Sequence, residues 1–265
     1  MSAIESKYKA KINIGRFYQV LGILIMFAII PWMRLVSFYV NDRALIQGGI
    51  MALIVSGQLV FRHGKRYLQQ SADQILETDQ RSPILLLRAF RMDNILIDRP
   101  KKLFFTRLRL RRDLIVPITF EEALTEVLQT AGPVIAIGRP GESLPPLGAS
   151  RTYVSDNEWQ IKVHDLAASS SYLVIIMDKT DGVQWEIEHI VPLFSKRKVL
   201  IVFPPTHFYT DLMQINTMLY KLGIDINIDN ELVAIAFDDK GKLIKISSKS
   251  NSMRKRLKLI ADYLD

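Results

Sequence analysis

The sequence predicts an α/β protein, with a flavodoxin-like, doubly wound parallel sheet of five strands preceded by a transmembrane helical hairpin. Two observations lead to this prediction. After residue 83, five short apolar runs alternate with helical patterns, which is typical of a parallel sheet covered by helices on both faces. Before residue 62, two much longer apolar runs follow each other closely. The 265 residues suffice for one domain of ordinary size and a membrane segment.

The two long runs have the length of membrane-spanning helices. Residues 17–40 carry Arg34 as their only charge, and residues 44–61 carry none. Each run approaches the ~20 residues needed to cross a bilayer, and neither shows the polar face of a core helix. A cleaved secretory signal is disfavoured because a second apolar run follows at once. We expect spanning helices at about 17–40 and 44–62, with a kink at Pro31 and with Arg34 reaching toward the headgroups rather than acting within the bilayer.

Basic residues flank this pair of helices and predict its orientation. They are Lys7, Lys9, Lys11 and Arg16 before the first run and Arg62, Lys65 and Arg66 after the second. The connector holds only Asp42 and Arg43. Because positive residues remain in the cytoplasm, we expect residues 1–66 to form a two-pass anchor in the inner (plasma) membrane with both termini cytoplasmic.

Small residues on the second run predict close helix packing. They are Gly48, Gly49, Ser56 and Gly57. Such residues let a helix approach either the first helix or another subunit, so we also expect a homo-oligomer.

The net charge of +8 suggests phosphate-rich partners, although flanking Lys and Arg that orient a membrane protein would give the same excess. The segment 99–112, RPKKLFFTRLRLRR, places Arg107, Arg109 and Arg111 on one face if it is extended. That face could contact anionic lipids, or the segment could be a solvated insertion. Nucleic acid is an unfavoured partner because a groove-reading motif and stacking aromatics are lacking.

The cytoplasmic region divides into a juxtamembrane helix and a domain. Residues 67–82 have an amphipathic pattern that would continue the second helix until Pro83 stops it. Residues 83–265 form the domain. Its expected strands are 84–87, 134–137, 173–177, 199–203 and 232–237. Helices are expected from residues 120, 157, 185 and 210, followed by a hairpin at 238–246 and a basic helix from 252.

Three loops follow predicted strands at one sheet edge, where ligands bind in open α/β sheets. The first loop supplies Arg88, Phe90 and Asp93, the second supplies Gly138, Arg139, Gly141 and Glu142, and the third runs from Asp178 to Glu186. The glycines would let the backbone approach a ligand, and the arginines could hold phosphate. A plain turn is the alternative for GRPGES, which matches neither the P-loop nor the dinucleotide fingerprint.

The third loop carries the most specific signal. We expect Trp185 and Glu186 to open a helix, which would place an aromatic platform beside an anion. Such a carboxylate can attack, or stabilise, a sugar carbon as an N-glycosidic bond breaks. The alternative is structural, because a Glu at a helix N-terminus complements the helix dipole and Trp185 could be core. Glu188 would lie on roughly the opposite side of the helix, so only one of the two acids should face the crevice.

The second crossover offers further candidates. Arg151, Tyr153, Glu158 and Trp159 could line the crevice. A packing and capping role is the favoured alternative, with Asp156 as the candidate N-cap. The absence of cysteine excludes disulfides and thiolate chemistry, and the four histidines lack metal-ligand spacing, so no metal is expected.

The order of strand, Asp, Gly-containing loop, aromatic, Glu, helix and the following strand KRKVLIVFP resembles the nucleoside 2-deoxyribosyltransferase family and, more distantly, TIR domains. The resemblance covers about residues 84–203. It implies that Glu186 is the nucleophile that takes the deoxyribosyl group. In TIR enzymes a Glu four residues after the Trp cleaves NAD, but this chain has His189 there, so Glu188 is the nearer substitute. The family's Gly after the Glu-aliphatic pair is also replaced, by Glu188.

The leading hypothesis is a membrane-anchored cytoplasmic domain that binds a nucleotide or nucleoside and cleaves or transfers its N-glycosidic bond. Arg88, Asp93 and Arg139 would hold ribose or phosphate, no cofactor would be needed, and NAD or a nucleoside would be the substrate. The resemblance to TIR proteins implies a prokaryotic stress or defence response. The rival is a catalytically inactive sensing or assembly module of the same fold. A channel is disfavoured because neither apolar run carries an acid.

Overall fold

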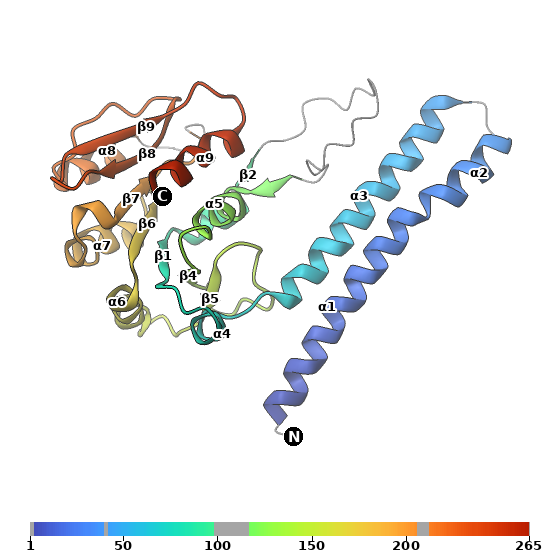
Figure 1. Ribbon diagram of the computed structural model, residues 1–265, viewed down its shortest axis with the longest axis horizontal. Helices are drawn as coiled ribbons and strands as arrows, with labels where there is room; N and C mark the ends of the chain where they lie inside the picture. Colours follow the sequence, from blue (N-terminus) through green and yellow to red (C-terminus); the bar gives the residue numbers. More distant parts are fainter. Residues whose placement is uncertain (1–2, 40–41, 98–116, 206–211, 265) are drawn as a thin grey trace. The chain divides into compact units, whose positions relative to one another are not determined.

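The computed structural model describes residues 3–39, 42–97, 117–205 and 212–264 (Figure 1). The chain divides into two compact units, one containing the N-terminal helices and one containing the sheet. The basic segment with Arg107, Arg109 and Arg111, for which we expected lipid contact or solvation, lies outside the described residues.

The first unit contains α1 (Ala3–Phe27), α2 (Ile29–Tyr39) and α3 (Arg43–Leu68), coloured blue to cyan in Figure 1. The stretches Lys9–Val36 and Leu45–Leu68 have mean hydropathies of 2.0 and 1.5 and are long and apolar enough to cross a membrane. Only 6% of the most apolar window of each stretch is buried, unlike a helix from the core of a soluble domain.

Pro31 interrupts the first predicted span. The α1 helix ends at Phe27 and α2 starts at Ile29, because Pro31 has no N–H for the Phe27 carbonyl and its ring crowds that carbonyl. Helical bonding resumes when Trp32 N donates to Ala28 O at 3.1 Å. The kink expected at Pro31 is therefore a break between two helices.

Glycines bring α1 and α3 into backbone contact. A Cβ placed on Gly22 would lie 2.6 Å from the Gly57 carbonyl oxygen, and one placed on Gly64 would lie 2.6 Å from the Gly15 carbonyl oxygen. Any larger residue would push the helices apart. Among the predicted small residues, Gly57 therefore packs within the hairpin, whereas nothing lies within 4 Å of a Cβ on Gly48.

The second unit is built on a seven-stranded sheet with the order β5-β4-β1-β6-β7-β8-β9. Its strands are β1 (Ile84–Leu87), β4 (Val134–Ile137), β5 (Ser150–Thr152), β6 (Tyr172–Ile176), β7 (Val199–Val202), β8 (Leu232–Phe237) and β9 (Leu243–Ser247). Strands β5, β4, β1, β6 and β7 are parallel. Strands β8 and β9 are antiparallel to their neighbours. A short separate pair joins β2 (Leu96–Ile97) and β3 (Ile118–Thr119).

The prediction of a five-stranded parallel sheet is thus wrong in two respects. The sheet has seven strands, and two of them, β8 and β9, are antiparallel to their neighbours. All five predicted strands exist, and they lie in the order 2-1-3-4-5. The missed β5 reads Ser-Arg-Thr and has no apolar run, and β9 belongs to the predicted hairpin. Strand β8 reverses because the irregular segment 222–231 returns the chain to the edge where β7 ends.

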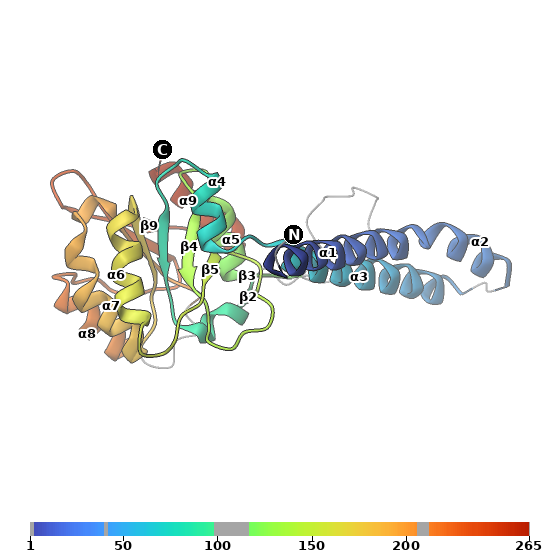
Figure 2. The ribbon, with the colours of Figure 1, turned by 90° about the horizontal axis from the view of Figure 1, so that it is seen from below.

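Helices cover both faces of this sheet. They are α4 (Ala72–Thr78), α5 (Phe120–Leu128), α6 (Trp159–Ser169), α7 (Asp181–His189), α8 (Leu212–Lys221) and α9 (Met253–Leu264). Figure 2 shows α6, α7 and α8 on one face and α4, α5 and α9 on the other. The strands β1, β4, β6, β7 and β8 are nearly continuous apolar runs, and every residue of β1, β4, β7 and β8 is buried.

Two predicted helix boundaries are wrong. The expected continuous helix through residues 67–82 is broken after Leu68, because Ser71 starts the new helix α4 with a capping box. Ser71 Oγ accepts from Gln74 N at 3.3 Å, and Gln74 Oε1 accepts from Ser71 N at 3.1 Å. Helix α7 begins at Asp181 after an extended Thr180, and not at Trp185.

Candidate functional site

A cavity of about 330 Å³ opens at the carboxyl ends of the parallel strands. Its wall comes from the end of β1 and the turn after it, the loop after β4, the segment before α6, and the first turns of α7. The neighbours of β1 in the sheet are β4 and β6, so the chain leaves β1 toward one side and later returns on the other. Ligands bind at such a switch point in doubly wound sheets.

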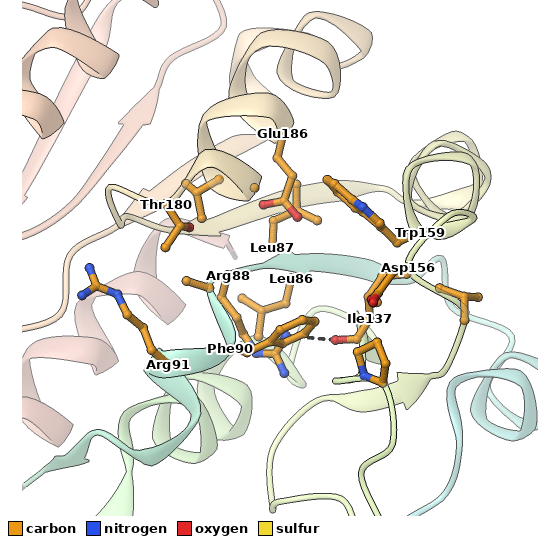
Figure 3. A pocket seen from close by; sticks show the side chains of 15 residues that line it. Leu86, Leu87, Arg88, Phe90, Arg91, Ile137, Asp156, Trp159, Thr180 and Glu186 are labelled. Atoms are coloured by element: carbon orange, nitrogen blue, oxygen red, sulfur yellow. Dashed lines mark hydrogen bonds between the residues drawn. The ribbon is translucent and has the colours of Figure 1, made fainter.

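Glu186 points from α7 into this cavity (Figure 3). Its side chain is nearly buried, at 8% exposure, and Oε2 has no hydrogen-bond partner in the part of the chain that the structure describes. Burial raises the pKa of Glu186 to about 8, and the attraction of Arg88 offsets only part of that rise. At pH 7 the acid on the cavity wall is therefore largely neutral, and positive charge beside it would favour its ionisation.

The helix dipole does not explain this glutamate. Because α7 begins at Asp181, Glu186 lies in the second turn, and the favourable dipole interaction falls off within the first turn. Asp181 occupies the first turn instead and is exposed to solvent.

The aromatic wall of the cavity is formed by Trp159 and Phe90, and not by Trp185. Trp185 is half-buried behind Trp159, with their ring centroids 4.9 Å apart in an edge arrangement, and it stacks on His189 at 4.7 Å. One residue along a helix corresponds to a rotation of about 100°, so adjacent residues cannot face the same point. The pairing of Trp185 with Glu186 as joint cavity walls is therefore wrong, and Trp185 supports Trp159.

Arg88 follows β1 and is held in a buried ion cluster. Its Nε donates to Glu121 Oε2 at 2.7 Å and lies 3.0 Å from Asp93 Oδ1, while Nη1 donates to the Ile137 carbonyl at 3.1 Å. Arg151 on β5 contacts the same two acids, with Nη2 2.9 Å from both oxygens of Glu121 and Nη1 3.1 Å from Asp93 Oδ2. Asp93 thus belongs to the cluster and does not line the cavity.

The two carboxylates of the cluster have opposite pKa shifts. Burial opposes ionisation of Glu121, but the attraction of Arg88 and Arg151 is stronger and lowers its pKa to about 2. Burial dominates for Asp93, and with the nearby negative charge of Glu121 it raises that pKa to about 6 despite the same two arginines. Glu121 is therefore the permanent anion of the cluster.

Asp178 and Arg91 form a second ion pair at the cavity. Asp178 is fully buried at the end of β6, where it accepts from Arg91 Nε at 2.6 Å and from Lys179 N at 2.6 Å. Arg91, which the sequence did not single out, is partly exposed and lines the cavity. Asp178 therefore holds Arg91 rather than facing the cavity itself.

The loop after β4 serves mainly structural tasks. A Cβ on Gly138 would lie 2.3 Å from the Tyr153 ring, and Gly141 has a φ of +74° in an exposed turn. Glu142 lies 3.3 Å from Arg151 Nη1 and accepts from the Tyr153 hydroxyl at 3.0 Å. Arg139 is exposed and outside the cavity wall. The turn interpretation fits these positions better than the phosphate cradle.

Glu188 and Asp156 also differ from their predicted places. Glu188 is exposed, outside the cavity, and accepts from Lys221 Nζ at 2.8 Å, which together with Gln184 lowers its pKa. Asp156 does not cap α6, because Glu158 occupies the N-cap position. Asp156 instead lines the cavity from an exposed position beneath Trp159 (Figure 3).

The chemistry of the site is therefore that of one buried acid facing an aromatic and mainly apolar cavity. Among the described residues, no group of three or more His, Cys, Asp or Glu side chains could hold a metal ion. The chain gives no significant match to a protein-family model, a curated protein or a solved structure. The site must be interpreted from its own geometry.

Proposed function

We propose that the protein is a membrane-anchored enzyme whose cytoplasmic α/β domain binds a nucleoside or nucleotide and cleaves or transfers its N-glycosidic bond. The observation that supports this proposal is the nearly buried Glu186, whose Oε2 lacks a partner among the described residues and which points into the cavity at the switch point of the sheet. Strongly perturbed carboxyls in clefts are frequent at catalytic sites.

The proposed role of Glu186 follows from the charge that develops on the sugar during the reaction. Breaking an N-glycosidic bond leaves positive charge on the sugar carbon, and a carboxylate in a site of low polarity stabilises that charge strongly. As the bond breaks, the electron pair leaves with the base, and Glu186 would pass its proton to that base or, where the base leaves neutral, to water. The resulting carboxylate would bond to the sugar carbon or stabilise its positive charge until water or a second base takes the sugar. Trp159 would stack on the base, and Asp156 at the rim could accept hydrogen bonds from ribose hydroxyls.

The volume of the cavity limits the size of the ligand that it can hold. A volume of about 330 Å³ lies at the lower end of the ~300–1,000 Å³ range of small-molecule pockets. One nucleoside, or the half of NAD that contains the reacting bond, suits this volume better than an entire dinucleotide. The resemblance to nucleoside deoxyribosyltransferases and TIR domains supports the same substrate class, with Glu186 rather than Glu188 as the acid.

The membrane part of the proposal rests on the two long apolar helices and their basic flanks. The anchor would hold both termini in the cytoplasm of a prokaryotic cell, with anionic lipid near the basic flanks and a homo-oligomer as the working form. A stress or defence response is the setting that the TIR resemblance suggests.

One observation favours the rival function, a sensing or assembly module without turnover. Burial keeps Glu186 largely neutral at pH 7, and a neutral acid can also serve as a hydrogen-bond donor to a ligand that is bound and not cleaved. The two functions differ in whether base is released.

The test uses the full chain in detergent micelles with NAD and a panel of nucleosides, and free base is followed by chromatography. We expect base release that Glu186→Gln reduces by at least ~100-fold, the scale of a lost catalytic group. Glu188→Gln, on the same helix but outside the cavity, is the matched control and should retain wild-type rates. Tight ligand binding without release would establish the sensor instead.

The sequence has no cysteine, so a single introduced cysteine is the only thiol that a maleimide can label in a test of membrane topology. Asp42→Cys in the connector should react with a membrane-impermeant maleimide on intact cells, whereas Ser250→Cys should react only after lysis. Labelling of Ser250→Cys from outside would overturn the proposed orientation.

A further inference from the structure

The proposed chemistry leaves one feature unexplained, the closed ring of four buried charges formed by Arg88, Glu121, Arg151 and Asp93. Each carboxylate contacts both guanidinium groups, at distances from 2.7 to 3.1 Å. All four side chains are 8% exposed or less. Burying charges costs desolvation energy that pairing often fails to recover, and apolar residues of similar volume commonly stabilise a fold as well or better. Such a ring suggests a role beyond stability.

Arg88 is the member of the ring that reaches the cavity wall. Three structural elements fix its guanidinium: Glu121 on α5, Asp93 after β1, and the Ile137 carbonyl on β4. Its Nη2 is buried and has no hydrogen-bond partner among the residues described. The guanidinium is therefore immobilised by the ring and by the Ile137 carbonyl, while Arg88 also lines the cavity that Glu186 enters from α7 (Figure 3).

The other charged groups around Glu186 are compensated or solvated. Arg91 on the cavity wall is paired with Asp178, and Asp156 at the rim is exposed to water. On α7 itself, Asp181, Glu188 and His189 are all exposed. Water and salt screen such charges much more than buried ones. The attraction that opposes the burial of Glu186 comes from Arg88.

We propose that the ring fixes the Arg88 guanidinium as the counter-charge of Glu186 across the cavity, which makes Arg88 a positioning residue that acts through that carboxylate. Glu121 and Arg151 orient Arg88 in turn. This inference deepens the proposed function and rests on it only for the role of Glu186. It assigns Arg88 a different task from the ribose or phosphate contact expected from the sequence.

The test is a titration that requires no turnover. The full chain, labelled with ¹³C at the glutamate side-chain carboxyl, is titrated in detergent micelles by NMR, and the Glu186 signal is assigned by its loss in Glu186→Gln. Arg88→Met should move the Glu186 midpoint upward by up to about one pH unit, the lower end of the effect of a close opposite charge. Arg88→Lys, which retains the charge, should restore at least half of that shift.

Arg139→Met is the matched control, because this exposed arginine lies two residues after β4 and outside the cavity wall. It should leave the Glu186 midpoint unchanged. Glu121→Gln should move the midpoint downward, because it removes the permanent anion of the ring while Arg88 remains. This variant decides the question if Arg88→Met does not fold.

The inference would be overturned if the Glu186 midpoint were unchanged in folded Arg88→Met. If Arg88→Met does not fold, an unchanged midpoint in Glu121→Gln would overturn it. In either case the ring would have a purely structural role. The base-release assay is independent of this outcome. Shifted midpoints without base release would retain the positioning role and end the enzymatic proposal.

Discussion

The α/β unit buries two glutamates, Glu121 in the ion ring and Glu186 on the cavity wall, and their pKa values shift in opposite directions. In the ion ring, Glu121 and Asp93 each meet two guanidinium groups, and the pKa of Glu121 falls to about 2. On the cavity wall, Glu186 Oε2 has no partner among the described residues, and burial raises the pKa of that acid to about 8. Glu121 and Glu186 are both nearly buried, so the difference between these two comes from the arginines, which contact Glu121 directly and, in the parts of the chain that the structure describes, form no ion pair with Glu186.

Folded proteins compensate nearly all buried polar groups, so an uncompensated one needs an explanation. The ring shows that this chain can surround buried acids with guanidinium groups where the fold requires it. Glu186 is the buried acid on the wall of the open cavity, and its Oε2 has no hydrogen-bond partner among the described residues, because Arg88 attracts it without forming an ion pair with it. The contrast suggests that the missing partner is supplied by a ligand.

Breaking the ring should have the largest effect on stability. Arg151→Met leaves Glu121 and Asp93 to share one guanidinium, and removal of one partner from a buried ion pair typically costs ~3–5 kcal/mol. Unfolding by urea in detergent, followed by tryptophan fluorescence, measures this loss. Lys245→Met removes an exposed pair with Asp229 and should cost no more than ~1 kcal/mol. Equal losses in the two variants would contradict the importance of the ring.

Neutralising Glu186 should have the next largest effect, and it should depend on pH. The folded-state pKa of about 8 lies above the ordinary value of 4.5, so the folded protein binds this proton more tightly than the unfolded chain. Wild-type stability is therefore highest below pH 4.5 and falls as the pH rises to about 8. Glu186→Gln removes that loss and should exceed the wild type at pH 9 by at most ~5 kcal/mol, at ~1.4 kcal/mol for each pKa unit between 4.5 and about 8, with little difference at pH 4.5.

Urea unfolding at several pH values between 4.5 and 9 checks this prediction. If catalysis needs the ionised form, kcat/KM for base release should rise over the same interval, reach half its maximum near pH 8 and level off above about pH 9. A stability difference that does not change with pH would mean that Glu186 is hydrated and not perturbed by burial.

Much of the sheet could be predicted because its central strands are continuous apolar runs. Strand β5 could not, since Ser150, Arg151 and Thr152 are polar, and the ion pairs that compensate the burial of Arg151 involve Asp93 and Glu121, which are distant in sequence. The break after Leu68 was missed although Ser71 and Gln74 have the spacing of a capping box, because the amphipathic pattern continues through it. Local patterns identified the elements, and tertiary contacts decided their boundaries and directions.

The sequence indicated where in the fold the cavity lies, but not which residues line it. The switch point and the motif after β6 indicated the sheet edge at which the structure has a cavity lined by Glu186, and the role of that cavity as a functional site stays a prediction. The start of α7 was missed because Asp181 and Gly182 resemble a loop, and that error of one helical turn paired Glu186 with Trp185 rather than Trp159. The ring joins Arg88 to residues 33 and 63 positions later, and no periodicity in the sequence signals such contacts.

Neutralising Glu188, the other glutamate of α7, should have the least effect on stability. It compares an exposed and a buried glutamate on the same helix. Two residues along a helix correspond to about 200°, so Glu188 faces solvent while Glu186 faces the cavity. Glu188→Gln loses an exposed contact with Lys221 and should leave both the melting temperature and the pH dependence of stability unchanged. Thermal unfolding at pH 5 and pH 9 measures both. If Glu188→Gln instead removed the pH dependence, the carboxyl that responds to burial would be the wrong one, and the cavity would lose its candidate for the acid that meets the sugar.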